Sequence, residues 1–477
     1  MFFNSLTFAV FLPIVFILYW FVFKRHLKAQ NIFLLIVSYV FYGWWDYRFL
    51  SLILLSTLID FYIGSALKKE ESSKKRKWLL ATSLLFNLGV LGFFKYANFF
   101  IESWVDAWSI LGVQMHTSTL QIILPVGISF YTFQTLSYTI DVYRKKMEPT
   151  SSFIQFATYV AFFPQLVAGP IERASHLLPQ FKKPRVFDFE TAKSGLHLII
   201  WGLFQKIVIA DSCATYVNAI FNNYEGMNSL SLLLGAVYFA LQIYGDFAGY
   251  SNIAIGVARL LGFDLMRNFN YPYFSRDIAE FWRRWHISLS TWFRDYLYIP
   301  LGGSRGSKRQ QIRNVFIIFI VSGFWHGANW TFVVWGALNA FYFLPVLLLK
   351  QNRKNLDVAG KGTLVSTGKE MIQIIITFAL TCIAWIFFRS ASIKDSFYYL
   401  ERMFTNLEFK KQYLNIERHS IEMVLLIAGF LFVEWLWREK ETPLSGKFDM
   451  IKVITTILLI IVLGVFSEHQ SFIYFQF

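Results

Sequence analysis

The sequence predicts an all-α fold built from many membrane-spanning helices. Of its 477 residues, 56% are hydrophobic and only 16% are charged, whereas a soluble domain has about 45–50% apolar and about 25% charged residues. Apolar runs of the length that crosses a bilayer, about 20 residues, recur from end to end. The 53 Phe and 16 Trp suit both the lipid core and its interfaces. We expect a polytopic bundle in one membrane domain, residues 1–477.

The candidate spans follow one another along the whole chain. Several are too short to cross alone, so we expect roughly ten to twelve crossings, with the other runs re-entrant or interfacial. The first run has no basic segment before it and no cleavage site, which favours a retained helix over a signal peptide. The spans are Leu6–Phe23, Ile32–Trp45, Leu50–Leu67, Leu79–Phe100, Leu120–Ile140, Ile154–Val167, Leu196–Ala210, Leu230–Leu261, Val315–Phe324, Phe332–Leu349, Ile372–Phe388, Ile421–Trp437 and Ile451–Phe466.

The net charge is +15, and the basic residues that produce it lie between the apolar runs. This placement is typical of cytoplasmic loops and argues against a nucleic-acid partner. Basic segments Lys24–Lys28, Lys68–Lys77 and Arg144–Lys146 are expected in the cytoplasm. The turn at Asp46 and the acidic segment Glu102–Asp106 are then expected outside, as is the N-terminus.

Three stretches are too polar to face lipid, and the first is Gln242–Asn252. Asp246 at a helix centre would cost about 2.5–3.5 kcal/mol, so it needs a cavity or a partner. Asp246, Tyr250 and Asn252 are therefore candidates for lining a substrate path. The alternative is a structural hydrogen bond between helices, helped by the small residues in the same stretch.

The second stretch is Glu280–Pro300, which predicts one continuous helix at the interface. One face is an aromatic stripe, and the neighbouring edge carries Arg283, His286 and Ser290 at i, i+3 and i+7. Arg283 is a candidate for contacting the substrate or donor, as is Ser290. The alternative is an anchoring helix whose Arg283 and Arg284 touch lipid phosphates. The stripe consists of Phe281, Trp285, Leu289, Trp292 and Tyr296.

The third stretch is Ser322–Trp330. His326 is followed by a glycine that leaves its backbone open to a ligand, and histidine is the side chain best suited to proton transfer near neutral pH. Trp325 and Asn329 beside it are candidates for contacting substrate. The alternative is a buried histidine that is hydrogen-bonded between helices.

Other catalytic patterns are missing from the sequence. It has no H-E-x-x-H or Cys/His metal spacing, no Walker A or dinucleotide motif, and no G-x-S-x-G elbow. Its two cysteines, Cys213 and Cys382, indicate neither a disulfide framework nor a metal cluster. A histidine without a nucleophile partner suggests a general base acting on an incoming hydroxyl. We expect no bound metal or cofactor.

In these stretches the chain resembles the membrane-bound O-acyltransferase family, in its bacterial alginate O-acetyltransferase branch. The segments that carry the resemblance run nearly end to end and in order. They are Pro125–Gln134, Phe163–Ile171, Gly245–Asn252, Phe281–Gly303, Phe324–Trp330 and Phe472–Phe477.

The resemblance implies helices that enclose a tunnel through the membrane, with His326 as the catalytic histidine and His286 as the second histidine of the family. It also implies acyl transfer from a cytoplasmic thioester, such as acetyl-CoA, to a hydroxyl on an extracytoplasmic polysaccharide. A periplasmic or exported acyltransferase often completes such a transfer. The chain would then be a multi-pass protein of the bacterial inner membrane.

Three alternatives stay open. One is D-alanyl transfer to teichoic acid from a carrier protein. Another is a transporter or flippase of a cell-envelope polymer, against which the lack of inverted repeats counts. The third is a membrane channel for the acyl group, with a partner forming the ester.

Overall fold

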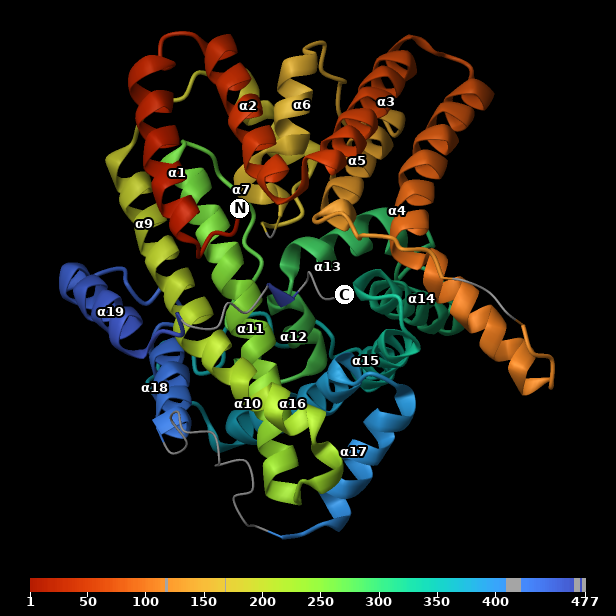
Figure 1. Ribbon diagram of the computed structural model, residues 1–477, viewed down its shortest axis with the longest axis vertical. Coiled ribbons are helices and arrows are strands. Elements are labelled where there is room, and N and C mark those ends of the chain that lie inside the picture. The colour runs from red at the N-terminus through yellow and green to blue at the C-terminus, as the bar shows by residue number, and fades with distance from the viewer. Residues whose placement is uncertain (116–118, 168, 409–421, 467–471, 474–477) are drawn as a thin grey trace. The chain divides into compact units, whose positions relative to one another are not determined.

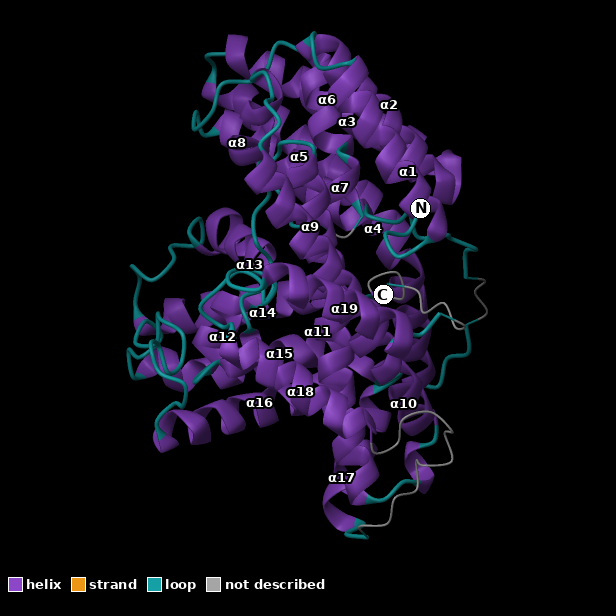
Figure 2. Ribbon diagram, turned by 90° about the vertical axis from the view of Figure 1, so that its left-hand side faces the viewer, coloured by secondary structure: helices purple, strands orange, loops and turns teal. Residues whose placement is uncertain are grey.

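The computed structural model describes residues 1–115, 119–167, 169–408, 422–466 and 472–473, and every regular element in them is a helix (Figure 2). The all-α prediction is thereby confirmed. Three of the segments named from the sequence fall partly outside the described residues. These are Ala168 in one motif, the last four residues of the Phe472–Phe477 motif, and Ile421 at the start of a span.

The described chain forms two compact units. Unit 1 comprises Met1–Gly195 and Ala254–Met266, and unit 2 comprises Leu196–Ile253 and Arg267–Phe477. Two helices contain residues of both units, α9 (Phe189–Leu203) and α11 (Ser229–Leu260). The expectation of a single membrane domain stays a prediction.

Unit 1 holds the first eight helices of the chain (Figure 1). They are α1 Leu6–Ile17, α2 Leu27–Asp46, α3 Leu50–Lys69, α4 Ser73–Ile110, α5 Ile128–Tyr143, α6 Phe153–Ala161, α7 Phe163–Leu166 and α8 Ala174–Leu177, with a π-helical turn η1 Leu18–Val22 and 3-10 turns η2 Tyr47–Phe49 and η3 Leu178–Lys182.

Unit 2 holds the other helices, among them those of the polar stretches. They are η4 Phe204–Ala210, α10 Asp211–Asn222, η5 Tyr224–Gly226, η6 Pro272–Phe274, α12 Ile278–Arg284, α13 Ile287–Phe293, η7 Arg294–Tyr298, α14 Lys308–His326, α15 Trp330–Leu348, α16 Gly368–Arg389, α17 Ile393–Thr405, α18 Glu422–Leu436 and α19 Asp449–Leu463.

The described helices include six segments long and apolar enough to cross a bilayer, and two shorter apolar ones. This chain is therefore a multi-pass membrane protein, while the number of crossings stays a prediction. The long segments are Leu27–Lys69, Ser73–Ile110, Phe189–Asn222, Ser229–Leu260, Trp330–Leu348 and Gly368–Arg389, and the shorter ones are Leu6–Val22 and Met423–Leu436.

Two predicted spans of unit 1 are wrong in extent. The run Ile154–Val167 is broken at Phe162, whose ψ of 106° is not helical, and Pro164 occupies the first turn of the next helix. The run Leu120–Ile140 becomes helical only at α5, because Gly127 before it adopts a left-handed φ of 73°. A Cβ at Gly127 would lie 2.7 Å from the carbonyl oxygen of Leu166, so only glycine fits there.

The basic turns of unit 1 meet at one end, where Figure 1 shows the α1–α2 and α3–α4 turns. Lys68 forms an ion pair with Glu148 at 3.0 Å, and Arg76 donates to the carbonyl of Tyr143 at 2.8 Å. Lys68–Lys77 and Arg144–Lys146 therefore share one end of the unit, which agrees with the orientation that the charge pattern predicts.

Candidate active site

His326 is the last residue of α14, and a short turn leads from it into α15 at Trp330. Figure 1 shows α14 and α15 as neighbours. The two helices can approach closely because Gly323 has no side chain. A Cβ there would lie 2.2 Å from the carbonyl oxygen of Phe332. Asn329 caps α15, since its Oδ1 accepts from Thr331 N at 2.9 Å. The Ser322–Trp330 stretch thus encodes a helix stop, a turn and a cap, and Asn329 serves the cap.

His286 lies at a break between two short helices, so the prediction of one continuous helix over Glu280–Pro300 is wrong. Helix α12 ends at Arg284, and His286 adopts a left-handed conformation (φ 43°, ψ 56°). The break is stabilised from outside the stretch: Asn270 N donates to Arg284 O at 3.0 Å, and Ile287 N donates to Asn268 O at 2.9 Å. These bonds take the place of helical ones, so the aromatic stripe is not one helical face.

The two histidines come together in unit 2, with ring centroids 6.5 Å apart. Only 1% of His286 and 3% of His326 is exposed. Aromatic rings surround them, and the candidate Trp325 contacts both. The nearest centroids to His326 are those of Trp325 at 4.9 Å, Trp335 at 5.2 Å and Phe388 at 5.4 Å, and those to His286 are Phe247 at 4.6 Å and Trp325 at 6.1 Å.

Burial among these rings lowers the pKa of His286 to about 3. The desolvation that causes the shift disfavours the imidazolium. At neutral pH the imidazole is therefore uncharged and presents one N–H donor and one acceptor nitrogen.

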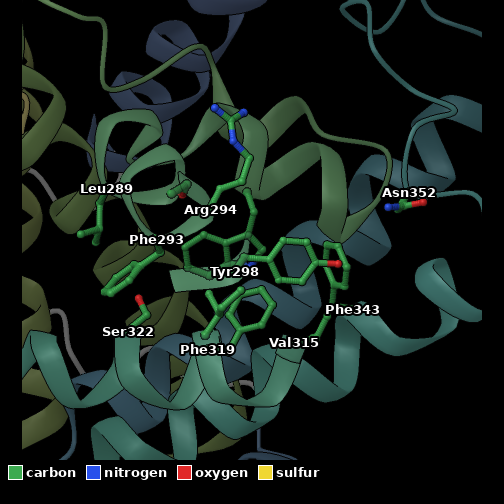
Figure 3. A pocket seen from close by; sticks show the side chains of 12 residues that line it. Leu289, Phe293, Arg294, Tyr298, Val315, Phe319, Ser322, Phe343 and Asn352 are labelled. Atoms are coloured by element: carbon green, nitrogen blue, oxygen red, sulfur yellow. The ribbon is translucent and has the colours of Figure 1, made fainter. Parts of the chain in front are cut away.

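A cavity of about 210 Å³ lies near the pair, and neither imidazole lines it. Ser290 lies one helical turn after His286, and Ser322 lies one turn before His326; both line the cavity, which ends short of the imidazoles. Figure 3 shows Ser322 beside Phe293, with Arg294 extending away from the rings. The lining residues are Trp282, Leu289, Ser290, Phe293, Arg294, Tyr298, Val315, Ile318, Phe319, Ser322, Phe343 and Asn352. A continuous tunnel stays a prediction.

The two arginines of α12 bind protein groups, and the alternative of a helix anchored on lipid phosphates stays a prediction. Arg283 donates to the carbonyls of Asn352 and Asn355, both at 2.6 Å. Arg284 is buried and donates to Glu280 Oε1 at 2.8 Å. Arg283 therefore fixes the cavity wall through Asn352 instead of lining the cavity itself.

The candidates of the first polar stretch belong to a separate buried network. Lys206 Nζ lies 2.7 Å from Asp211 and 2.7 Å from Asp246, and the second oxygen of Asp246 accepts from Ile473 N at 2.6 Å. Tyr250 packs its ring 5.7 Å from Lys206 Nζ. Asp246 thus has the partner that its burial requires, and this agrees with the structural alternative.

Asn252 joins the same region, since its Nδ2 donates to Gln205 Oε1 at 2.8 Å. Phe472 packs 4.6 Å from Tyr250 and 5.9 Å from Phe247. Because Phe247 contacts His286, this network supports the site from behind without lining the cavity.

Sequence reasoning missed three kinds of residue here. Lys206 could have been found, because a lysine within the apolar run Leu196–Ala210 needs a buried partner. Trp282 and Asn352 line the cavity, and Asn268 holds the break, but no local pattern distinguishes them. Within the described residues, no group of three His, Cys, Asp or Glu is placed to hold a metal ion.

Comparison with known proteins agrees with these motifs. The membrane-bound O-acyltransferase family matches residues 143–387, a range that contains both histidines. The chain is 40% identical to the "probable alginate O-acetylase AlgI" of Pseudomonas aeruginosa (94% of this chain, 84% of that one). It is 30% identical to the peptidoglycan O-acetyltransferase of Helicobacter pylori (100% and 97%) and 27% identical to the teichoic acid D-alanyltransferase of Bacillus subtilis (58% and 71%).

The fold and the family match together define a polytopic membrane enzyme. The chain belongs to the membrane-bound O-acyltransferase family, and its similarity to the alginate O-acetylases confirms the branch that its motifs predict. It is thus an O-acyltransferase, and the transporter and flippase alternatives are wrong.

Proposed function

We propose that this enzyme transfers an acetyl group from a cytoplasmic thioester, acetyl-CoA, to a hydroxyl of an extracytoplasmic polysaccharide. Similarity over most of the chain to an alginate O-acetylase and a peptidoglycan O-acetyltransferase supports acetyl as the group and polysaccharide as the acceptor class. The observation that carries the proposal is the pairing of His286 with His326, 6.5 Å apart and buried. Two separate motifs supply them, and a cavity ends one helical turn from each.

In this proposed reaction His326 is the general base. It accepts the hydroxyl proton of the acceptor as the oxygen attacks the carbonyl carbon of the thioester. A C–O bond forms, the C–S bond then breaks, and the proton passes from His326 to the departing thiolate. The net products are the acetyl ester and the free thiol.

His286 stabilises the oxyanion that forms during this attack. With a pKa of about 3 it is neutral and can donate one N–H, the form of donor that a preorganised oxyanion site requires. Packing against Phe247 and Trp325 holds the ring in position before substrate arrives. Aromatic surroundings exclude water, which limits hydrolysis of the thioester.

The cavity suits the extended arm of the donor. Leu289, Phe293 and Phe319 give its wall apolar surface. Ser290, Ser322 and Asn352 add polar groups that suit the amides of the pantetheine arm. Arg294 lies at its edge with an exposed guanidinium paired to Asp295 at 2.8 Å, where a donor phosphate could bind. Access from the cavity to the imidazoles then requires the side chains around Ser290 and Ser322 to move.

The test uses purified protein in lipid with labelled acetyl-CoA and a deacetylated polysaccharide. We expect thioester consumption that depends on the acceptor and label recovered in the polymer. Thioester cleavage without label in the polymer would instead favour the acyl-channel alternative, in which a periplasmic or exported partner forms the ester. No cleavage with any acceptor would contradict the proposal.

D-Alanyl transfer is a second candidate, favoured by the similarity to the Bacillus subtilis enzyme. That similarity covers a smaller share of the chain than the alginate relatives do. Supplying carrier-bound D-alanine in place of acetyl-CoA separates the two, because only one donor should be consumed. The proposed location is the inner membrane of a bacterium.

A further inference from the structure

A second cavity of unit 2 is a groove of about 450 Å³ between α9, η4, α18 and α19. Its lining is apolar along most of its length, and none of the residues that line the cavity beside the histidines belongs to it. The lining residues are Trp201, Phe204, Leu425, Leu426, Gly429, Phe430, Val433, Trp437, Pro443, Leu444, Ile451, Lys452, Thr455, Thr456 and Leu459. It is therefore a separate cavity from the one proposed for the donor.

The two ends of the groove differ in chemistry. Trp437 and Lys452 lie at the connection between α18 and α19, where one helix ends and the other begins. Moving away from that connection, α18 contributes Val433 through Leu425, and α19 contributes Thr455 and then Leu459. One end carries the cation Lys452, and the rest is apolar, with aromatic rings from Trp201, Phe204 and Phe430. Amphiphilic molecules have the same polarity, and Trp and Lys are typical of the level of lipid headgroups.

The length of the groove matches one leaflet. From Trp437 to Leu425 is 12 residues of helix, or about 18 Å, and half of a hydrocarbon core about 30 Å thick is about 15 Å. Helix α19 also exposes Ile454 to 52% and Ile461 to 63%, an exposure that lipid, not water, accommodates.

The cationic end is fixed in place. Lys452 Nζ donates to the carbonyl of Ser445 at 3.0 Å and lies 4.8 Å from the ring centroid of Trp437. An ammonium group has three donors, so Lys452 can bind a phosphate oxygen while it keeps the bond to Ser445.

We propose that this groove binds one phospholipid, with an acyl chain along α18 and the headgroup phosphate on Lys452. The groove is then a specific lipid site, distinct from the donor cavity and independent of the acyl-transfer reaction. An anionic headgroup is preferred, because Lys452 contributes a positive charge at the mouth.

Gly429 gives a sharp test, since it lines the groove and a Cβ there would meet nothing within 4 Å. Gly429→Phe should remove the bound lipid. Gly89→Phe is the matched control, because Gly89 is also open on an apolar helix but lies outside the groove. The charge is tested by Lys452→Gln, with the exposed Lys447→Gln as its control.

The measurement is native mass spectrometry of detergent-purified protein titrated with phosphatidylglycerol. We expect one retained lipid, lost in Gly429→Phe and bound about tenfold more weakly in Lys452→Gln, as for the loss of one charge-assisted hydrogen bond. Both controls should bind as the unmodified protein does.

Three results would overturn the proposal. One is equal retention by Gly429→Phe and Gly89→Phe. A second is displacement of the lipid by inorganic phosphate alone, which would indicate an anion site. A third is a dimer that dissociates in Gly429→Phe, which would make a second copy the occupant. If Gly429→Phe fails to fold, the two lysine variants alone decide, and equal affinity in them counts against the site.

Discussion

His176 in unit 1 and His286 in unit 2 lie in the same apolar protein, yet their surroundings give them different charge states, positive for His176 and neutral for His286. His176 Nδ1 lies 2.8 Å from Glu172 and its Nε2 lies 3.5 Å from Asp264. Hydrogen bonds first to Asp264 and then to Glu172 raise its pKa to about 10, whereas burial among aromatic rings lowers that of His286 to about 3.

The difference separates a structural histidine from one suited to catalysis. As an imidazolium, His176 has no acceptor nitrogen and bridges two carboxylates, one on each of two loops of unit 1. As a neutral ring, His286 keeps both a donor and an acceptor. The charge state follows from the neighbours, and no pattern around a single histidine in the sequence reports it.

The largest expected effect is the loss of acetyl-transfer rate in His326→Ala, with His176→Gln as the variant for comparison. Loss of a general base should lower the acetyl-transfer rate by about 10²–10⁴-fold, while His176→Gln should retain the specific activity of whatever protein accumulates. The rates are measured on equal amounts of purified protein. Equal loss in both variants would erase the contrast between the two sites.

The role of His286 is tested by two replacements of similar size. His286→Leu removes the N–H and should lower kcat by about 10²–10³-fold, the usual cost of one oxyanion donor. His286→Gln keeps an uncharged N–H and should recover part of that loss. A glutamine variant as inactive as the leucine variant would argue that packing, not donation, is what His286 provides.

A smaller effect is expected from Asn268, which we assign as a positioning residue for His286. Ser288 Oγ, two residues after His286, donates to Asn268 Oδ1 at 2.6 Å. Asn268→Ala should lower kcat about tenfold, as for one lost hydrogen bond of about 1.4 kcal/mol, with KM unchanged.

Ser288→Ala removes the other partner of the same bond. The double variant should therefore be no slower than either single one, because coupled residues are not additive. Additive losses, or a change confined to KM, would show that Asn268 does not act through the backbone of His286.

The sequence predicted the helical class, which is confirmed, because this depends on composition. The catalytic roles of His326 and His286 follow from the family resemblance and stay predictions, although the structure does bring the two rings together. The turn after His326 also has local causes, namely Gly327 and the cap Asn329. The break at His286 could not be predicted, since it depends on backbone bonds to Asn268 and Asn270, far from any turn signal. A continuous helix was the local preference of Glu280–Pro300, and tertiary pairing overrode it.

Asp246 also shows what the sequence could not predict, namely which residue would be its partner. Its cost in lipid predicted a partner, and the structure supplies Lys206 at 2.7 Å. Which residue would meet it depends on how η4 packs against α11, and neither segment alone carries that information. Polar residues in apolar spans therefore indicate a buried contact reliably, but they do not distinguish a substrate path from an ion pair.

The smallest predicted effects are the slopes of stability with pH, and here the two histidines differ in sign. The folded pKa of His176, about 10, lies above the value of about 6.5 in an unfolded chain. Its contribution is therefore fully present below pH 6.5 and is lost as pH rises through 10. The folded pKa of His286, about 3, lies below 6.5, so its burial opposes folding increasingly as pH falls from 6.5 toward 3.

For the fully buried His286 this slope is at most about 1.4 kcal/mol per pH unit, and for the half-exposed His176 it is smaller because solvent screens the ion pairs. Thermal unfolding in detergent from pH 4.5 to 9.5 measures both. His176→Gln should flatten only the alkaline limb, and His286→Gln only the acid limb. A variant that flattened the opposite limb would assign the charged state to the wrong histidine and reverse the comparison between the two units.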